Sequence, residues 1–260
     1  MYIRYEVADR IATITLDRPE AANAQNRDLL DELDAAWTRA ADDPGVSVIV
    51  LRAEGKHFSA GHDLRDGRGA ELSKITLELI YENEARRYLE YSLRWRNVPK
   101  PSIAAVQGKC IAGGLLLCWP CDLIVAADDA QFSDPVVLMG IGGVEYHGHT
   151  WELGPRKAKE ILFTGRSVTA EEARQVGMVN EVVPRAELDA RTAALAARIA
   201  SMPPFGLRQA KRAVNQTLDV QGFYAAIQSV FDIHQTGHGN ALSVTGYPIL
   251  AALDEMKSKT

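Results

Sequence analysis

A glycine-rich turn between two apolar segments is the feature that most constrains the fold of this chain. The turn covers residues 107–114, after the apolar run 102–106 and before a second apolar run. This pattern predicts a buried strand, a tight turn and the first turn of a helix. A helix start carries unpaired N–H groups and partial positive charge, and glycine lets a ligand approach the backbone closely. The segment therefore suits an oxyanion better than a core.

A second segment with the same character lies at residues 58–64, after the apolar strand predicted at 46–51. It again places small residues at the end of a strand. Two such turns could each give one N–H group to the same oxygen. Two donors directed at a developing enolate are what the stabilisation of a thioester-derived oxyanion requires, and one such donor typically changes a rate by ~10²–10³.

With these turns and several shorter motifs, the chain resembles the crotonase superfamily, the enoyl-CoA hydratase/isomerase family. The motifs follow family order and spacing over about residues 3–184. They are Leu16-Asp17-Arg18-Pro19, Asn23-Ala24, Phe58-Ser59-Ala60-Gly61-His62-Asp63, residues 108–114 with Cys121-Asp122, Ala130-Gln131-Phe132, Phe163-Thr164-Gly165-Arg166, and residues 173–183 with Gly177-Met178-Val179-Asn180.

The resemblance implies an α/β fold with a crotonase-like spiral of ββα turns. Residues 1–195 would form this core with its acyl-CoA site, and residues 196–260 an α-helical C-terminal region that packs in a homotrimer, commonly doubled to a hexamer. The implied substrate is an acyl-CoA thioester, and the implied activity is that of an enoyl-CoA hydratase-like lyase of fatty acid metabolism. Coenzyme A would be part of the substrate, with no prosthetic group and no metal.

The resemblance also assigns roles to individual positions. Ala60 and Gly113 match the two oxyanion-hole positions, whose N–H groups would polarise the thioester carbonyl. The residues expected along the nucleotide and pantetheine are Arg18, Ala24, Ala60, His62, Asp63, Leu64 and Gly113.

The chain departs from family hydratases at both catalytic glutamates. Leu116 stands three residues after the oxyanion glycine, and Val136 follows Pro135 where the second glutamate is expected. Neither side chain can move a proton, so the usual hydratase mechanism cannot operate unchanged. We expect Leu116, Val136 and Gly140 to line the acyl pocket.

A polar cluster soon after Val136 offers replacements. Glu145 is the first candidate acid or base, followed by Tyr146, His147 and His149, because a histidine or a carboxylate in an apolar pocket commonly carries protons near neutral pH. A solvated loop, a subunit contact, pairing of Glu145 with His149 along a helix, or a metal site remain alternatives. Asp134 is a minor candidate that could instead cap a turn.

Two other functions remain open. The segment 59–63 and the Pro135-Val136 pair resemble the acyl-CoA decarboxylase branch of the family. Decarboxylation needs the oxyanion hole but no base. Alternatively, the chain is an acyl-CoA-binding protein that has lost catalysis, because Leu116 and Val136 favour an apolar ligand tail over water.

Composition excludes several other classes. The net charge of −5 gives no basic field for nucleic acid. The N-terminus lacks the apolar region of a signal peptide, and the apolar stretch 110–127 is interrupted by Pro120 and Asp122. We therefore expect a cytoplasmic protein without a membrane segment. The three cysteines, Cys110, Cys118 and Cys121, are expected to be small buried hydrophobes.

Hydrophobic periodicity places the remaining elements. Alternation around Asp9 and Arg10 predicts a hairpin of residues 3–7 and 11–15. Further strands are predicted at 102–106, 123–126 and 181–183. Helices are predicted at 26–41, 72–96, 156–163, 170–175, 188–202, 205–218 and 223–234, with another C-terminal helix at 241–256.

Overall fold

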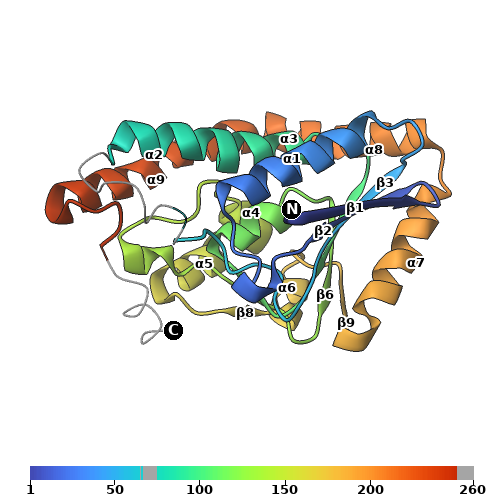
Figure 1. The fold of residues 1–260 in the computed structure, drawn as a ribbon, viewed down its shortest axis with the longest axis horizontal. Coiled ribbons are helices and arrows are strands. Elements are labelled where there is room, and N and C mark those ends of the chain that lie inside the picture. Colours follow the sequence, from blue (N-terminus) through green and yellow to red (C-terminus); the bar gives the residue numbers. More distant parts are fainter. Residues whose placement is uncertain (65, 67–74, 251–260) are drawn as a thin grey trace.

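A six-stranded sheet forms the centre of the molecule in the computed structural model, which describes residues 1–64, 66 and 75–250 (Figure 1). The strand order is β1-β2-β3-β4-β6-β9, and only the β1–β2 pair is antiparallel. The strands are β1 (Ile3–Ala8), β2 (Ile11–Leu16), β3 (Val48–Ala53), β4 (Ser102–Val106), β6 (Leu123–Ala127) and β9 (Glu181–Val183). A second sheet consists of β5 (Lys109–Ile111), β7 (Gln131–Ser133) and β8 (Val168–Thr169).

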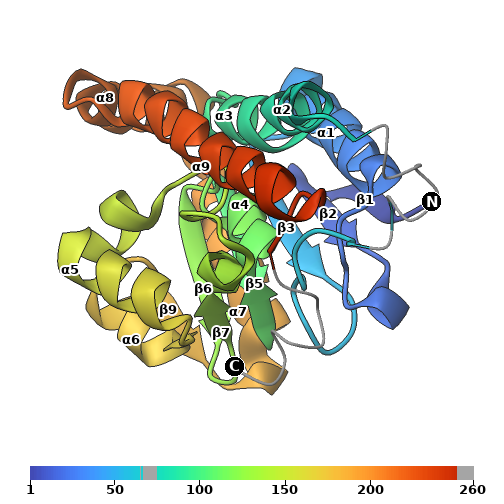
Figure 2. The same cartoon turned by 90° about the vertical axis from the view of Figure 1, so that its left-hand side faces the viewer.

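Helices cover both faces of the large sheet (Figures 1 and 2). The helix α7 packs on β3, β4 and β6 from one side, where Val48, Val50 and Ala196 are buried together. The helices α1, α2, α3, α8 and α9 form a layer along one side of the molecule, at the top of both views. Because both faces of the parallel strands are buried, β3 and β4 are almost continuously apolar rather than alternating.

The helix bounds are α1 (Arg27–Asp42), α2 (Leu77–Glu84), α3 (Tyr91–Arg96), α4 (Leu115–Cys118), α5 (His149–Thr164), α6 (Ala170–Gln175), α7 (Leu188–Ala200), α8 (Pro204–Val220) and α9 (Phe223–Thr245). A π-helical segment, Ala85–Glu90, joins α2 to α3. The side chain of Asn26 caps α1 by accepting from the N–H of Leu29. Thr169 and Glu172 form a capping box at the start of α6.

Most predicted elements are confirmed, among them the hairpin, α6 and β9. Three predictions need correction. The turn 107–114 contains the short strand β5, because its backbone pairs with β7. The helix predicted from 156 already begins at His149 and is broken at Gly154, which has a positive φ of 74°. No helix begins at residue 241, because α9 continues through Thr245 and ends at Gly246 with φ 70°.

Some predicted segments lie partly outside the described residues, namely 72–74 of the long helical segment and 251–256 of the last one. The predicted domain boundary at 195/196 falls within α7 and stays a prediction. The three cysteines are free and buried, as expected. Among the helices of residues 1–64 and 75–250, none combines the length and apolar character that a membrane span requires.

Candidate functional site

The two small-residue turns lie directly against each other. The backbone of Ser59 accepts from the N–H of Ile111 at 3.0 Å and donates to the carbonyl of Lys109 at 3.2 Å. A Cβ atom on Gly113 would lie 3.2 Å from the backbone nitrogen of His62. A Cβ atom on Gly61, where φ is +86°, would lie only 2.7 Å from the Ile111 carbonyl oxygen. The close approach of the two backbones therefore requires glycine at both positions.

The N–H group of Ala60 is not available to a ligand, because it donates to the carbonyl of Ala22 at 2.9 Å. The prediction of Ala60 as an oxyanion donor therefore needs correction. The backbone pairing of the next turn uses the N–H of Asp63 and the carbonyl of Gly61, both toward Gln25. Among the described residues, the bonds of turns and loops include none donated by the N–H of His62 or Gly113. Gly113 lies in the first turn of the 3₁₀ helix Ala112–Gly114, where backbone N–H groups have no partner within the helix. The N–H groups of His62 and Gly113 are therefore two adjacent donors that a ligand can use.

Gln25 joins the two turns, and no sequence pattern indicated this role. Its buried side-chain amide donates to the carbonyl of Gly113 at 2.7 Å. Its backbone N–H donates to Gly61 at 2.8 Å, and its carbonyl accepts from Asp63 at 2.9 Å. Ala112, just before Gly113, has a positive φ of 47°, a strained conformation for a residue with a Cβ atom. The hydrogen bond from Gln25 to the Gly113 carbonyl holds the peptide after Gly113 in place.

Glu145 lies beside the two small-residue turns. Its Oε1 atom is 3.0 Å from Nε2 of His62, the residue whose N–H is one of the two free donors. The Glu145 side chain is only 1% exposed, whereas that of His62 is 23% exposed. The ion-pair contact is close but not aligned as a hydrogen bond, and within the described part of the chain neither carboxylate oxygen of Glu145 has a hydrogen-bond partner. A buried carboxylate left in this state has unused capacity to accept protons or donors.

The surroundings of this pair favour a charged histidine. Burial alone would lower the pKa of His62, but the charge and contact of Glu145 raise it above its ordinary value. The ring of Tyr88 lies edge-on to the His62 ring, with centroids 4.0 Å apart. Burial and the charge of Glu145 raise the pKa of Tyr88 well above its usual value, so its hydroxyl is neutral at pH 7. Nothing in the sequence connected Tyr88 with this site.

The other polar residues of the segment 134–149 point elsewhere. His149 contacts Asp134 at 2.9 Å, and both side chains are fully buried, so the alternative pairing of His149 with Glu145 is wrong. Asp134 accepts from the N–H groups of Val136 and Val144 and thereby caps the local turn. His147 stacks near His149, and burial lowers its pKa to about 4. The structure thus separates Glu145 from its sequence neighbours.

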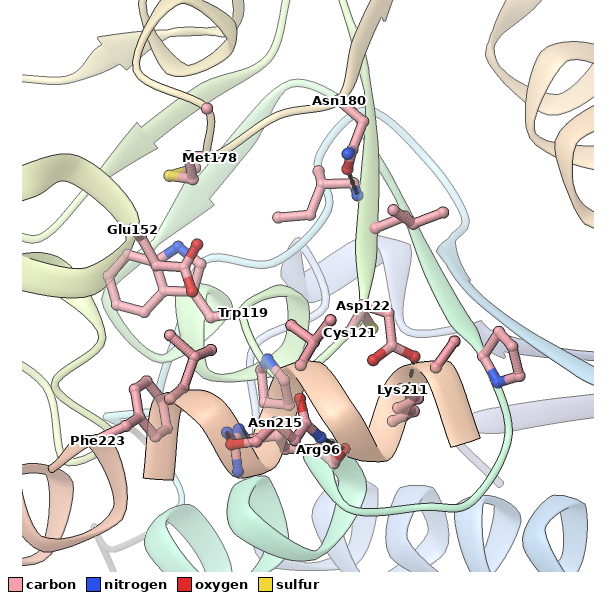
Figure 3. A pocket seen from close by; sticks show the side chains of 18 of the residues that line it. Arg96, Trp119, Cys121, Asp122, Glu152, Met178, Asn180, Lys211, Asn215 and Phe223 are labelled. Atoms are coloured by element: carbon pink, nitrogen blue, oxygen red, sulfur yellow. Dashed lines mark hydrogen bonds and ion pairs between the residues drawn. The ribbon is translucent and has the colours of Figure 1, made fainter. Parts of the chain in front are cut away.

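Tyr146 lines a different cavity, of about 450 Å³, between α8 and the ends of α4 and β6 (Figure 3). Trp119, Glu152 and Phe223 lie at one end of this cavity, and Lys211 forms an ion pair with Asp122 farther along it. Burial raises the pKa of Glu152 to about 7. Neither Gly113, His62 nor Glu145 contributes to the lining, so the structure does not bring Tyr146 into the oxyanion site.

The residues expected along the nucleotide do lie together. Arg18 forms an ion pair with Asp63 at 2.7 Å and also donates to the carbonyl of Ala24. Leu64 follows this pair in the same turn and is partly buried. These contacts fix the shape of the turn that carries His62, whatever else the side chains bind.

The three positions expected in the acyl pocket are apolar or lack a side chain. Leu116 and Val136 belong to the main hydrophobic core. Gly140 has a positive φ of 83°, and a Cβ atom there would collide with Leu250. Leu116 and Val136 cannot carry a proton, whereas Glu145 is a carboxylate beside the turn that carries His62.

This fold and paired-turn geometry agree with the family model for enoyl-CoA hydratase/isomerase, which matches residues 6–239. The chain belongs to the enoyl-CoA hydratase/isomerase family. A relative from Mycobacterium tuberculosis that carries the name enoyl-CoA hydratase EchA13 is 45% identical, over 94% of this chain and 83% of its own length.

Solved structures support the same family and the crotonase fold. A structure from Mycobacterium smegmatis, described as an enoyl-CoA hydratase, is 79% identical with a TM-score of 0.93, covering 96% of this chain and all of that one. One from Mycobacterium thermoresistibile, described in the same way, is 82% identical with a TM-score of 0.93 and the same coverage. This enoyl-CoA hydratase/isomerase family member therefore has the crotonase fold along almost its whole length.

Proposed function

We propose that this family member is an enoyl-CoA hydratase-like lyase that stabilises a thioester enolate with the N–H groups of His62 and Gly113. Relatives named as enoyl-CoA hydratases support the class of substrate, an acyl-CoA thioester. The two adjacent free N–H groups support the mode of catalysis.

The observation that carries the proposal is the buried state of Glu145. The Glu145 carboxylate is 1% exposed and has no hydrogen-bond partner among the described residues, so its burial costs folding free energy. Buried ionisable groups with such a cost cluster at functional sites, which favours a catalytic role for Glu145. In this proposal Glu145 replaces the two absent glutamates as general base and acid. His62, whose pKa is raised, is its ionic partner.

The proposed reaction balances without a cofactor. Glu145 takes a proton from water while the water oxygen bonds to the β-carbon of the enoyl group. The electron pair of the double bond moves onto the thioester oxygen, where His62 and Gly113 stabilise it. The enolate then takes the proton back at its α-carbon, and Glu145 returns to its starting state. General acid–base catalysis of this kind typically contributes ~10²–10⁴ in rate.

Coenzyme A would lie along the turn that includes Arg18, Ala24, His62, Asp63 and Leu64. The Arg18–Asp63 ion pair is consistent with a rigid wall for the pantetheine. The protein would need no prosthetic group, because the chemistry uses only side chains and backbone N–H groups.

We also propose assembly as a homotrimer or a hexamer through the C-terminal helices. None of the residues of α8 is buried in the single chain. Even the large apolar side chains of Phe205 and Val220 are 69% and 84% exposed. An amphipathic helix with an uncovered apolar face is typical of a subunit contact. Light scattering after size exclusion would give the number of copies.

Decarboxylation and binding without turnover are the competing functions. Leu116 and Val136 favour both, because decarboxylation needs no base and an apolar lining suits a fatty tail. Both would leave Glu145 without a catalytic role.

Mass spectrometry of the protein with a panel of small enoyl-CoA and malonyl-type CoA thioesters tests these functions. Gain of water supports hydration, whereas loss of carbon dioxide or binding without any mass change would overturn it in favour of the corresponding alternative. Gly113→Ala tests the proposed donor turn, because its Cβ atom would lie 3.2 Å from the His62 nitrogen and 2.8 Å from Gln25 Oε1. We expect this change to lower hydration by roughly 10²–10³.

A further inference from the structure

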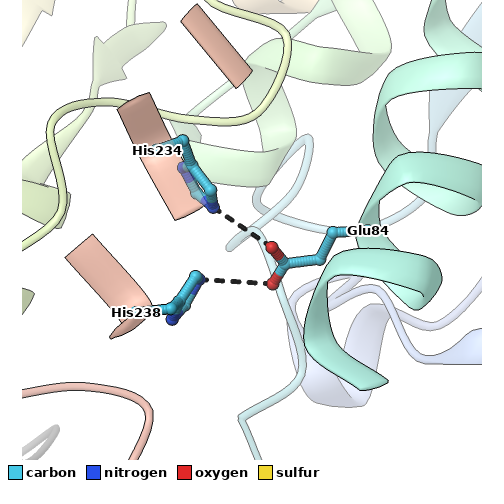
Figure 4. Close-up of side chains that lie close together, drawn as sticks. All are labelled: Glu84, His234 and His238. Carbon is cyan, nitrogen blue, oxygen red and sulfur yellow. Dashed lines mark hydrogen bonds and ion pairs between the residues drawn. The ribbon is translucent and has the colours of Figure 1, made fainter. Parts of the chain in front are cut away.

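A second buried polar cluster joins α2 to α9, close enough to Glu145 and His62 to act on them electrostatically. It consists of Glu84, His234 and His238 (Figure 4). The Nε2 atom of His234 is 3.2 Å from one Glu84 oxygen, and the Nε2 atom of His238 is 3.4 Å from the other. The two histidines are spaced i and i+4 on α9, so they face the same side of that helix.

The tautomers of both histidines follow from their other contacts. Nδ1 of His234 lies 2.7 Å from the carbonyl oxygen of Gly143, and Nδ1 of His238 lies 2.7 Å from that of Pro248. A carbonyl oxygen can only accept, so each Nδ1 carries the hydrogen. In the neutral ring the Nε2 atom then has a lone pair, and both lone pairs point at the oxygens of Glu84. The contact therefore needs positive charge at Nε2, which either a second ring proton or a bound metal ion supplies.

We propose that Glu84, His234 and His238 bind a divalent transition-metal ion, with Zn²⁺ as the best fit. Two imidazole nitrogens and a carboxylate are a common ligand set for zinc, with bonds of about 2.0–2.2 Å. A tetrahedron with such bonds has edges of roughly 3.4 Å, close to the two nitrogen–oxygen separations. The ligand atoms all lie within 4.8 Å of one another.

The surroundings match those of a metal centre. Metal-binding histidines usually donate their second ring N–H to a carbonyl or carboxylate, and both do so here. The amide of Gln235 donates to Glu84 at 2.7 Å and orients the carboxylate. Each Glu84 oxygen faces one histidine (Figure 4), so the carboxylate can supply two ligand atoms. The side chains are at most 13% exposed, as expected for a structural rather than an open catalytic site.

The position of the site gives it a structural role. It connects α2 to α9, and through the Gly143 carbonyl it also holds the segment that carries Glu145 two residues later. A metal ion there would fix both helices and this segment in one arrangement.

Calorimetric titration of the full chain, without an affinity tag and after treatment with a chelator, tests the site with Zn²⁺. We expect one ion per chain, at least ~100-fold weaker binding in Glu84→Gln and His238→Ala, and ~10–100-fold weaker binding in Gln235→Ala. The matched control is Glu78→Gln, an exposed position on α2, which should bind zinc like the wild type. Equal binding by the folded ligand variants and the wild type would overturn the proposal.

A measurement on the wild-type protein guards against variants that do not fold. Crystals soaked in Zn²⁺ should give an anomalous peak at the zinc edge between Glu84 and the two Nε2 atoms. Zinc peaks at other positions in the crystal, with none between Glu84 and the two Nε2 atoms, would overturn the proposal.

Discussion

The segment 134–149 supplies the carboxylates of two histidine–carboxylate pairs, Asp134 with His149 and Glu145 with His62. The two carboxylates differ in the hydrogen bonds that they accept. In the pair of Asp134 and His149 both side chains are fully buried, and Asp134 accepts from two backbone N–H groups. In the pair of Glu145 and His62 the carboxylate is just as buried, but no donor is aligned with either oxygen within the described residues. His62 is also partly open to solvent.

The difference separates a structural pair from one available for chemistry. Asp134 fixes the start of the 3₁₀ helix Pro135–Met139 and closes the segment at Val144. Its pKa would be raised by burial, but the contact with His149 and the backbone donors lower it. Glu145 has one ionic partner and unused acceptor capacity. On the proposed function, unused hydrogen-bond capacity, rather than burial, marks the pair that the substrate would use.

The largest expected effect tests the pair of Glu145 and His62. On the proposed function, Glu145→Gln keeps the shape of the side chain but removes the proton carrier, so kcat for hydration should fall by ~10²–10⁴. The change also removes the ionic partner of His62, so the free energy of unfolding is measured beside kcat to separate a loss of stability from a loss of catalysis. Steady-state kinetics and urea unfolding measure both quantities. Unchanged hydration would show that Glu145 has no role in catalysis.

The opposite outcome is expected for the pair of Asp134 and His149. Asp134→Ala leaves two backbone N–H groups and a buried histidine without their partner, which should lower the free energy of unfolding by roughly 3–5 kcal/mol. The kcat of the folded fraction should fall much less than in Glu145→Gln. A stable Asp134→Ala protein that is inactive would reverse the roles that we assign to the two pairs.

Glu152 is a third buried carboxylate, and it contrasts with Asp134 because burial raises its pKa to about 7. Because the folded pKa lies above the unfolded value of about 4.5, the protonated form favours the folded state. Its contribution is fully present below pH 4.5 and is lost as the pH rises through 7. Glu152→Gln should therefore stabilise the protein by about 3 kcal/mol above pH 8 and have no effect below pH 4.5, at about 1.4 kcal/mol per pKa unit. Thermal unfolding across this range gives the answer, and a pH-independent difference would contradict it.

The smallest effect is a change in the titration of His62. In the wild type the charge of Glu145 outweighs burial and raises the pKa of His62. In Glu145→Gln only burial and the remaining neighbours act, so the pKa should fall, which NMR of the imidazole protons can follow. His147 provides the control, because its low pKa, about 4, comes from burial and not from Glu145. An unaltered His62 titration would mean that the two groups are not coupled.

Local pattern was sufficient for much of the fold. Apolar runs gave β3, β4 and β6, and alternation around Asp9 gave the β1–β2 hairpin, because burial on one or both faces leaves a period in the sequence. Short strands such as β5 left no such period, since three residues depend on the partner strand alone.

The sequence by itself indicated the family and the two small-residue turns, and it predicted that Glu145 replaces the glutamates expected at positions 116 and 136. It did not determine which N–H groups are free. That depends on the carbonyl of Ala22, which accepts the hydrogen bond of the Ala60 N–H group. The N–H group of His62 is then the one that lies beside Gly113. It also did not group Tyr88 with Glu145, or Glu84 with His234 and His238, about 150 residues away. Such groups meet only when packing brings distant helices together, because hydrogen bonds and charges act over a few ångströms of space and carry no period along the chain.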